Sequence, residues 1–183
     1  MYIFVLVIVI FIVSAIFREQ DYNRIPKKIW TYNNIHKYKD YEITILTKKF
    51  FNYVNIPVEI SSHPNFNLHI SDLVRIYAMA EFGGIWTDSD VPSFKMFPRY
   101  AEFSGITKKG ILQKSFFACN KGSPFVTLWR DEFIKIAYFP SVEKYVESLK
   151  RDITVENMEN VLILSAEKVL ETYPKSSLIF TEL

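Results

Sequence analysis

The chain has 183 residues, and 22 Lys and Arg against 20 Asp and Glu give a formal net charge of +2 at pH 7. This length predicts one compact domain and leaves no room for a second full one. The near balance of charge excludes the strongly basic face of a nucleic-acid-binding protein, so we expect no nucleic-acid partner. Apolar types make up 49% and charged types 23%, which excludes a disordered chain and allows a core.

The N-terminal segment is apolar enough to meet a membrane. Residues 2–17 contain one polar side chain, Ser14, and the first charged side chain is Arg18. As a helix this run would be about 24 Å long, close to the ~30 Å hydrocarbon layer of a bilayer. It predicts a single-pass N-terminal anchor and a membrane location. The alternative is a cleaved signal peptide, because Val13-Ser14-Ala15 offers small residues before a cut.

The charges around this segment bear on its orientation. Basic side chains follow the apolar run and none precedes it. The positive-inside rule therefore favours a cytosolic body, while the side of the membrane stays open. The expected organisation is an anchor or signal peptide over 1–17, a connector over 18–27 and a folded domain over 28–183.

The folded domain alternates between strand and helix signals. Apolar residues recur at helical spacing from Leu73 onward, which predicts a helix with an N-cap at Ser71 and a stop at Gly83. The other predicted elements are strands over 28–30, 41–46 and 84–87, a short helix over 47–53, a strand over 115–119, helices over 124–136 and 143–149, and a short strand over 161–164 before a helix from Ala166. Strand, helix and strand in this order predict an α/β domain with a mostly parallel sheet.

Spacing excludes several common sites. The five glycines form neither a Gly-x-Gly-x-x-Gly turn nor a P-loop. The three histidines belong to no zinc motif, and the twelfth position from Asp88 is Arg99 rather than the acidic residue of a calcium loop. Cys119, the single cysteine, lies in an apolar run, which predicts a buried inert thiol rather than a nucleophile.

Two carboxylates stand one residue apart where the strand over 84–87 is expected to end. At a strand period of two, the side chains of Asp88 and Asp90 leave the same face. Paired carboxylates suit a divalent cation that keeps positions free for phosphate oxygens, and ligands of α/β sheets bind at the carboxyl ends of strands. The alternative for Asp88-Ser89-Asp90 alone is a solvated turn.

The neighbouring motifs add a family resemblance. Ser71-Asp72-Leu73-Val74-Arg75, Gly83-Gly84 and Asp88-Ser89-Asp90 occur in order at fitting distances. Together they resemble the core of DXD-containing glycosyltransferases of the capsular polysaccharide and mannosyltransferase type, which are related to the large clostridial glucosylating toxins. Segments 25–30 and 120–125 resemble the opening strand and a later segment of the capsular branch. The resemblance covers about residues 25–136 and implies a GT-A-like nucleotide-sugar-binding domain, Rossmann-like with a mixed sheet.

The resemblance also implies roles for individual residues. Trp30 would stack on the nucleotide base, and Asp72 would bind sugar or ribose hydroxyls. Arg75 would contact the diphosphate, Asp88 would touch ribose or sugar and assist the metal, and Asp90 would be the direct ligand of Mn²⁺ or Mg²⁺. Asp88, Asp90 and Arg75 are thus the expected catalytic residues. Each has a structural alternative: a core position for Trp30, a favourable charge at a helix N-terminus for Asp72 and a local ion pair for Arg75.

The implied activity is hexose transfer from a nucleotide-diphosphate sugar to a glycan, lipid or protein acceptor, in polysaccharide biosynthesis and with retention of configuration. We find no counterpart of the C-terminal His- or Trp-bearing loop that closes the site in many relatives, so the domain would be reduced at its C-terminus. One alternative is therefore a membrane-tethered, non-catalytic homologue that acts as an interaction protein. Another is a haloacid-dehalogenase-type phosphatase, whose nucleophile loop also reads Asp-x-Asp.

Overall fold

The computed structural model describes residues 24–32, 38, 40–47, 50, 56–64, 66–88, 101–138, 161–174 and 178–182. The predicted anchor over 2–17, the helix over 143–149 and most of the helix over 47–53 lie outside these ranges. Within them, no helix combines the length and the apolar character needed to cross a membrane.

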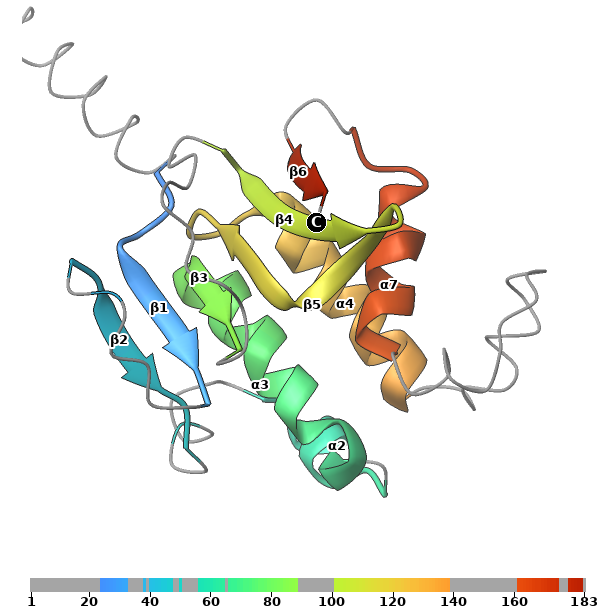
Figure 1. Ribbon diagram of the computed structural model, residues 1–183. Coiled ribbons are helices and arrows are strands. Elements are labelled where there is room, and N and C mark those ends of the chain that lie inside the picture. The colour runs from blue at the N-terminus through green and yellow to red at the C-terminus, as the bar shows by residue number, and fades with distance from the viewer. Residues whose placement is uncertain are drawn as a thin grey trace, which may run out of the picture.

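Six strands form one mixed sheet in the order β2-β1-β3-β5-β4-β6 (Figure 1). The strands are β1 (Lys28–Thr31), β2 (Glu42–Ile45), β3 (Gly84–Thr87), β4 (Phe103–Lys108), β5 (Ile111–Cys119) and β6 (Leu178–Glu182). The helices are α2 (Val58–Ser61), α3 (Phe66–Phe82), α4 (Pro124–Tyr138) and α7 (Val161–Leu170). The predicted α/β class is confirmed.

Strand direction divides the sheet into two parts. β1 pairs in parallel with both β2 and β3, and β4 pairs in parallel with β6. β5 runs antiparallel to its neighbours β3 and β4. The middle of β5 therefore lies beside the carboxyl end of β3, where the backbone N–H of Asp88 donates to the Ser115 carbonyl at 2.8 Å. This pairing brings a late segment of the chain to the edge where parallel strands end.

Alternating side chains fill the two faces of the sheet. Trp30 and Trp86 face the side covered by α3, α4 and α7, and they belong to the large core. Ile29 and Ile85 point to the other face, where they join a smaller buried cluster. This alternation is what a strand period of two requires when both faces are buried. It explains why β1 and β3 contain almost no exposed side chain.

A double-glycine turn connects α3 to β3. Gly83 has φ +64° and Gly84 has φ +110°, backbone conformations that residues other than glycine rarely adopt. A Cβ on Gly83 would lie 2.5 Å from the backbone nitrogen of Lys121, and one on Gly84 would lie 2.6 Å from the Lys28 carbonyl oxygen. The two glycines thus allow close backbone approach at the amino end of β3, away from the carboxylates at its other end.

Two predictions of local structure need correction. Ser71 is not an N-cap, because α3 begins five residues earlier at Phe66 and Ser71 lies in its interior. Residues 161–164 are the first turn of α7 rather than a strand, and they pack on α4 through a hydrogen bond from Trp129 Nε1 to the Leu162 carbonyl at 2.7 Å. Strands β4 and β6 were not predicted, whereas β1, β2, β3 and α4 are confirmed.

Candidate functional site

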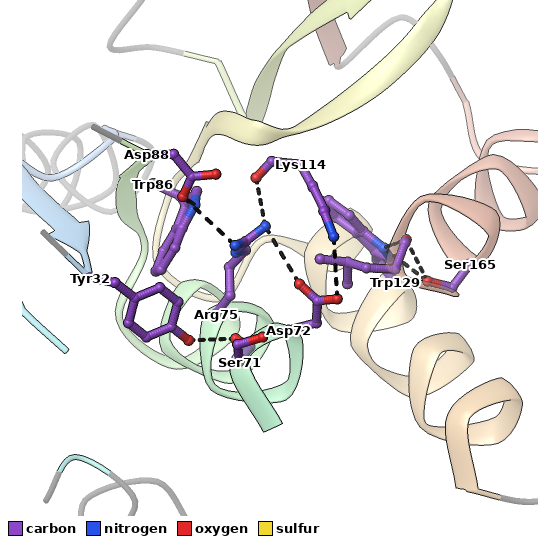
Figure 2. Close-up of polar contacts among 10 residues, drawn as sticks. Tyr32, Ser71, Asp72, Arg75, Trp86, Asp88, Lys114, Trp129 and Ser165 are labelled. Carbon is purple, nitrogen blue, oxygen red and sulfur yellow. Dashed lines mark hydrogen bonds and ion pairs between the residues drawn. The ribbon is translucent and has the colours of Figure 1, made fainter. Parts of the chain in front are cut away.

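Charged side chains gather at the carboxyl end of β3, where the first half of α3 and the middle of β5 meet (Figure 2). α3 contributes Asp72 and Arg75, β3 is followed by Asp88, and β5 contributes Lys114. Asp72 and Arg75 are three residues apart on a helix and therefore share a face. The predicted spacing thus brings Asp72, Arg75 and Asp88 together.

Arg75 is the centre of this charged cluster, which we define as Asp72, Arg75, Asp88 and Lys114. Its Nη1 lies 3.5 Å from Asp72 Oδ1, and its Nη2 lies 3.7 Å from Asp88 Oδ1. Nη1 also donates a hydrogen bond to the Lys114 carbonyl at 3.0 Å. The guanidinium carbon lies 4.5 Å from the ring centroid of Trp86, within cation–π distance. A buried arginine is therefore fixed between two carboxylates by a backbone carbonyl and an indole face.

The two carboxylates differ in exposure. The Asp72 side chain is 11% exposed, and its second oxygen lies 3.8 Å from Lys114 Nζ. The Asp88 side chain is 30% exposed, and its Oδ1 accepts a hydrogen bond from Trp86 Nε1 at 3.1 Å. Asp88 is thus the carboxylate that a ligand from solvent reaches more easily, while Asp72 stands at the buried side of Arg75.

Tyr32 closes the cluster on the β1 side. It follows β1, its hydroxyl donates to the Ser71 carbonyl at 2.5 Å, and its ring contacts Trp86 edge-on with centroids 5.0 Å apart. Burial raises the pKa of this phenol, and the positive charge of Arg75 opposes the rise. Tyr32 is therefore a neutral hydroxyl at physiological pH, and it locks the first strand to the helix that carries Asp72 and Arg75.

Trp30 lies apart from the charged cluster. Its indole is 2% exposed, its Nε1 donates to the Gly83 carbonyl at 2.7 Å, and its ring packs against Phe50 and Phe82. In this conformation Trp30 is a core residue at the double-glycine turn. Stacking on a base stays a prediction that requires the ring to become uncovered. Asp90 lies outside the described residues.

Three buried polar atoms in or beside the cluster have no hydrogen-bond partner among the described residues, and one of them is Arg75 Nε. The second is Nε2 of His69, which precedes Asp72 by one helical turn. The third is the hydroxyl of Tyr138, whose ring lies 6.1 Å from that of His69. Burial lowers the pKa of His69; Asp72 opposes this shift and Lys114 adds to it. His69 and Tyr138 are therefore uncharged near neutral pH.

The chemistry of the cluster is compatible with Mn²⁺ or Mg²⁺. Among the described residues, no three His, Cys, Asp or Glu side chains are grouped to hold a metal. Mg²⁺ is commonly bound by only one or two carboxylates together with substrate phosphates, and a partly exposed carboxylate at a strand end meets that need. Asp88 fits the role, and Asp90 would be the second carboxylate.

Comparison with known proteins identifies the family. Residues 19–173 match the family described as "Capsular polysaccharide synthesis protein". The chain belongs to this family. The resemblance to the capsular branch is thereby confirmed, and membership in the capsular polysaccharide synthesis family supports a glycosyltransferase. A solved structure titled "PaToxG Glycosyltransferase" is similar over 81% of this chain and 73% of its own, with a TM-score of 0.47 and 13% sequence identity. No curated protein matches.

The structure adds residues to the candidate site of this family member that the sequence did not indicate. Lys114 and Tyr32 belong to no motif, and they reach the cluster only through pairing of the strands that carry them. Trp86 lies in β3 just before Asp88, and its indole contacts both Arg75 and Asp88. The one local signal for Tyr32 was its place two residues after the end of the first predicted strand.

Proposed function

We propose that this member of the capsular polysaccharide synthesis family is a metal-dependent glycosyltransferase with a GT-A-like domain. It transfers a hexose from a nucleotide-diphosphate sugar to a glycan, lipid or protein acceptor and retains the anomeric configuration. The observation that carries the proposal is the meeting of Asp72, Arg75 and Asp88 at the carboxyl end of β3. Family membership supports the same activity.

Each side chain in the cluster has a task suited to its chemistry. The planar guanidinium of Arg75 donates to phosphate oxygens, and its fixed position keeps the cost of ordering low. Asp72 accepts hydrogen bonds from sugar hydroxyls, while Asp88 and Asp90 hold Mn²⁺ or Mg²⁺. The bound cation would neutralise negative charge on the departing diphosphate. Catalysis then consists mainly of positioning the donor and stabilising the leaving group.

The arrangement also explains why Arg75 is surrounded by acidic groups when no donor is bound. An arginine buried beside two carboxylates has its charge balanced, so the site avoids an uncompensated buried cation. Both ion pairs are longer than the roughly 2.7–2.9 Å of a strong charge-assisted hydrogen bond. Phosphate oxygens can therefore replace these contacts with shorter ones.

The proposal is tested by donor turnover in the full chain. We expect nucleotide sugars to raise the melting temperature in the presence of Mn²⁺, and the matching donor to be hydrolysed slowly without an acceptor. Asp90→Ala should abolish metal-dependent turnover and keep the melting temperature of the unliganded protein. The matched control is Asp40→Ala, an exposed aspartate outside the cluster. Unchanged turnover in Asp90→Ala would overturn the mechanism.

The same experiments separate the alternatives. A non-catalytic homologue would bind a nucleotide sugar without hydrolysing it. A phosphatase would be stabilised by phosphate mimics and not by nucleotide sugars. Attachment to a membrane through residues 2–17 is a further part of the proposal, and it predicts that the full chain sediments with membranes and is released by detergent but not by high salt.

A further inference from the structure

Lys114 contributes two different groups to the charged cluster. Its carbonyl accepts the hydrogen bond from Arg75 Nη1 at 3.0 Å, and its ammonium lies 3.8 Å from Asp72 Oδ2. The carbonyl belongs to β5, which is fixed beside the end of β3 by the hydrogen bond from the Asp88 N–H to the Ser115 carbonyl. The backbone of residue 114 therefore holds Arg75 in place, whatever side chain stands there.

The ammonium of Lys114 is only loosely engaged. Its side chain is 35% exposed, and the 3.8 Å separation from Asp72 is too long for a strong hydrogen bond. Within the described part of the chain, Lys114 Nζ donates no hydrogen bond. A partly exposed ion pair at this distance contributes little to stability. The fold thus gains little from this ammonium, and its N–H donors are available to a ligand.

Charge balance indicates what the ligand is. Asp72 and Asp88 carry two negative charges, and Arg75 and Lys114 carry two positive charges, so the four residues sum to zero. A divalent cation bound with the donor would bring the total over these four residues to +2. Without Lys114 the same sum is +1, so the lysine doubles the net positive charge that attracts an anion.

The position of the ammonium fits an anion with two charged groups. Asp72 lies between the two cations, with Arg75 at 3.5 Å from one of its oxygens and Lys114 at 3.8 Å from the other. The two cations therefore flank one carboxylate, and the two phosphoryl groups of one diphosphate can each contact one of them. We propose that the Lys114 ammonium is a second donor, beside Arg75, that binds the diphosphate of the sugar nucleotide. This inference rests on the proposed function and extends it.

The test measures binding of Mg²⁺ with inorganic pyrophosphate to the full chain by calorimetry. Lys114→Met removes the ammonium and keeps both the carbonyl and the apolar stem of the side chain. We expect the dissociation constant for pyrophosphate to rise about tenfold to a hundredfold, and Lys114→Arg to restore most of the affinity. Lys108→Met is the matched control, because Lys108 lies on the same β4–β5 hairpin outside the cluster; its affinity should equal that of the wild type.

A structural role for Lys114 would give a different result. If the ammonium were structural, Lys114→Met would have a lower melting temperature than the wild type, whereas we expect the two to be equal. Lys114→Gln is a second neutral variant in case Lys114→Met does not fold. Equal pyrophosphate affinity in wild type and Lys114→Met would overturn this inference and leave the proposed function standing. A wild-type protein that binds neither pyrophosphate nor any nucleotide sugar in the presence of metal would overturn both.

Discussion

Replacing Arg75 by alanine removes the group on which the charged cluster depends. The variant loses the hydrogen bond to the Lys114 carbonyl, worth about 1 kcal/mol, and the contact with the Trp86 ring, worth about 1 kcal/mol. Asp72 loses one cationic partner but keeps Lys114, and Asp88 is partly exposed, so the cost stays below the roughly 3–5 kcal/mol of a fully orphaned buried charge. We expect the free energy of unfolding to fall by about 2–3 kcal/mol.

The assay is urea unfolding followed by tryptophan fluorescence, since all three tryptophans are buried. Arg130→Ala is the matched control, because Arg130 pairs with the adjacent Asp131 and contacts the Tyr77 ring nearer the surface. That variant should lose less than about 1 kcal/mol. Asp72→Asn should cost less stability in the Arg75→Ala background than in the wild type, because Asp72 has already lost its ion pair with Arg75 there. Wild-type stability in Arg75→Ala would refute this account of the cluster.

Three further predictions concern stability. Gly84→Ala should destabilise the protein by more than about 2 kcal/mol, because φ is positive there and a Cβ would meet the Lys28 carbonyl. Gly110→Ala is the control: Gly110 has φ +74° and no atom within 4 Å of an added Cβ, so this variant should lose only about 1 kcal/mol of stability in the same denaturation experiment. Tyr138→Phe should leave stability unchanged or raise it by about 1 kcal/mol, because the buried hydroxyl has no hydrogen-bond partner among the described residues; a clear loss of stability would contradict this. Because the pKa of His69 is lowered in the folded protein, the unfolded chain takes up a proton first as pH falls, and stability should decline below about pH 6.5. His69→Gln should make this decline smaller, as measured by thermal melts across pH 5–8.

Local patterns predicted those elements whose signals lie within one segment. The apolar spacing from Leu73 onward and the stop at Gly83 gave α3 its correct end. Its start was misplaced because Ser71 has the chemistry of an N-cap, although the helix continues through it from Phe66. The run over 161–164 is equally compatible with strand and helix, and only its packing on α4 decides for helix.

For the candidate site too, some residues could be placed from local patterns and others only from long-range strand pairing. Helical spacing is enough to place Asp72 and Arg75 on one face, and a strand end is enough to place Asp88 near them. Lys114 could not be predicted, because its place depends on the antiparallel register of β5 on β3, a long-range pairing with no local signal. For Trp30, the buried indole agrees with the core position given as its structural alternative, and stacking on a base stays a prediction.

The Lys114 carbonyl on β5 accepts a hydrogen bond from Arg75, so the candidate site forms only when β5 has joined the sheet. A chain whose β4–β5 hairpin has not docked beside β3 lacks both the anchor for the guanidinium and the neighbouring ammonium. Binding competence and strand docking are therefore one cooperative event. An anion captured by these cations would strengthen the middle of the whole sheet, and its effect should be seen as slower amide hydrogen exchange in β3 and β5 far from the point of contact.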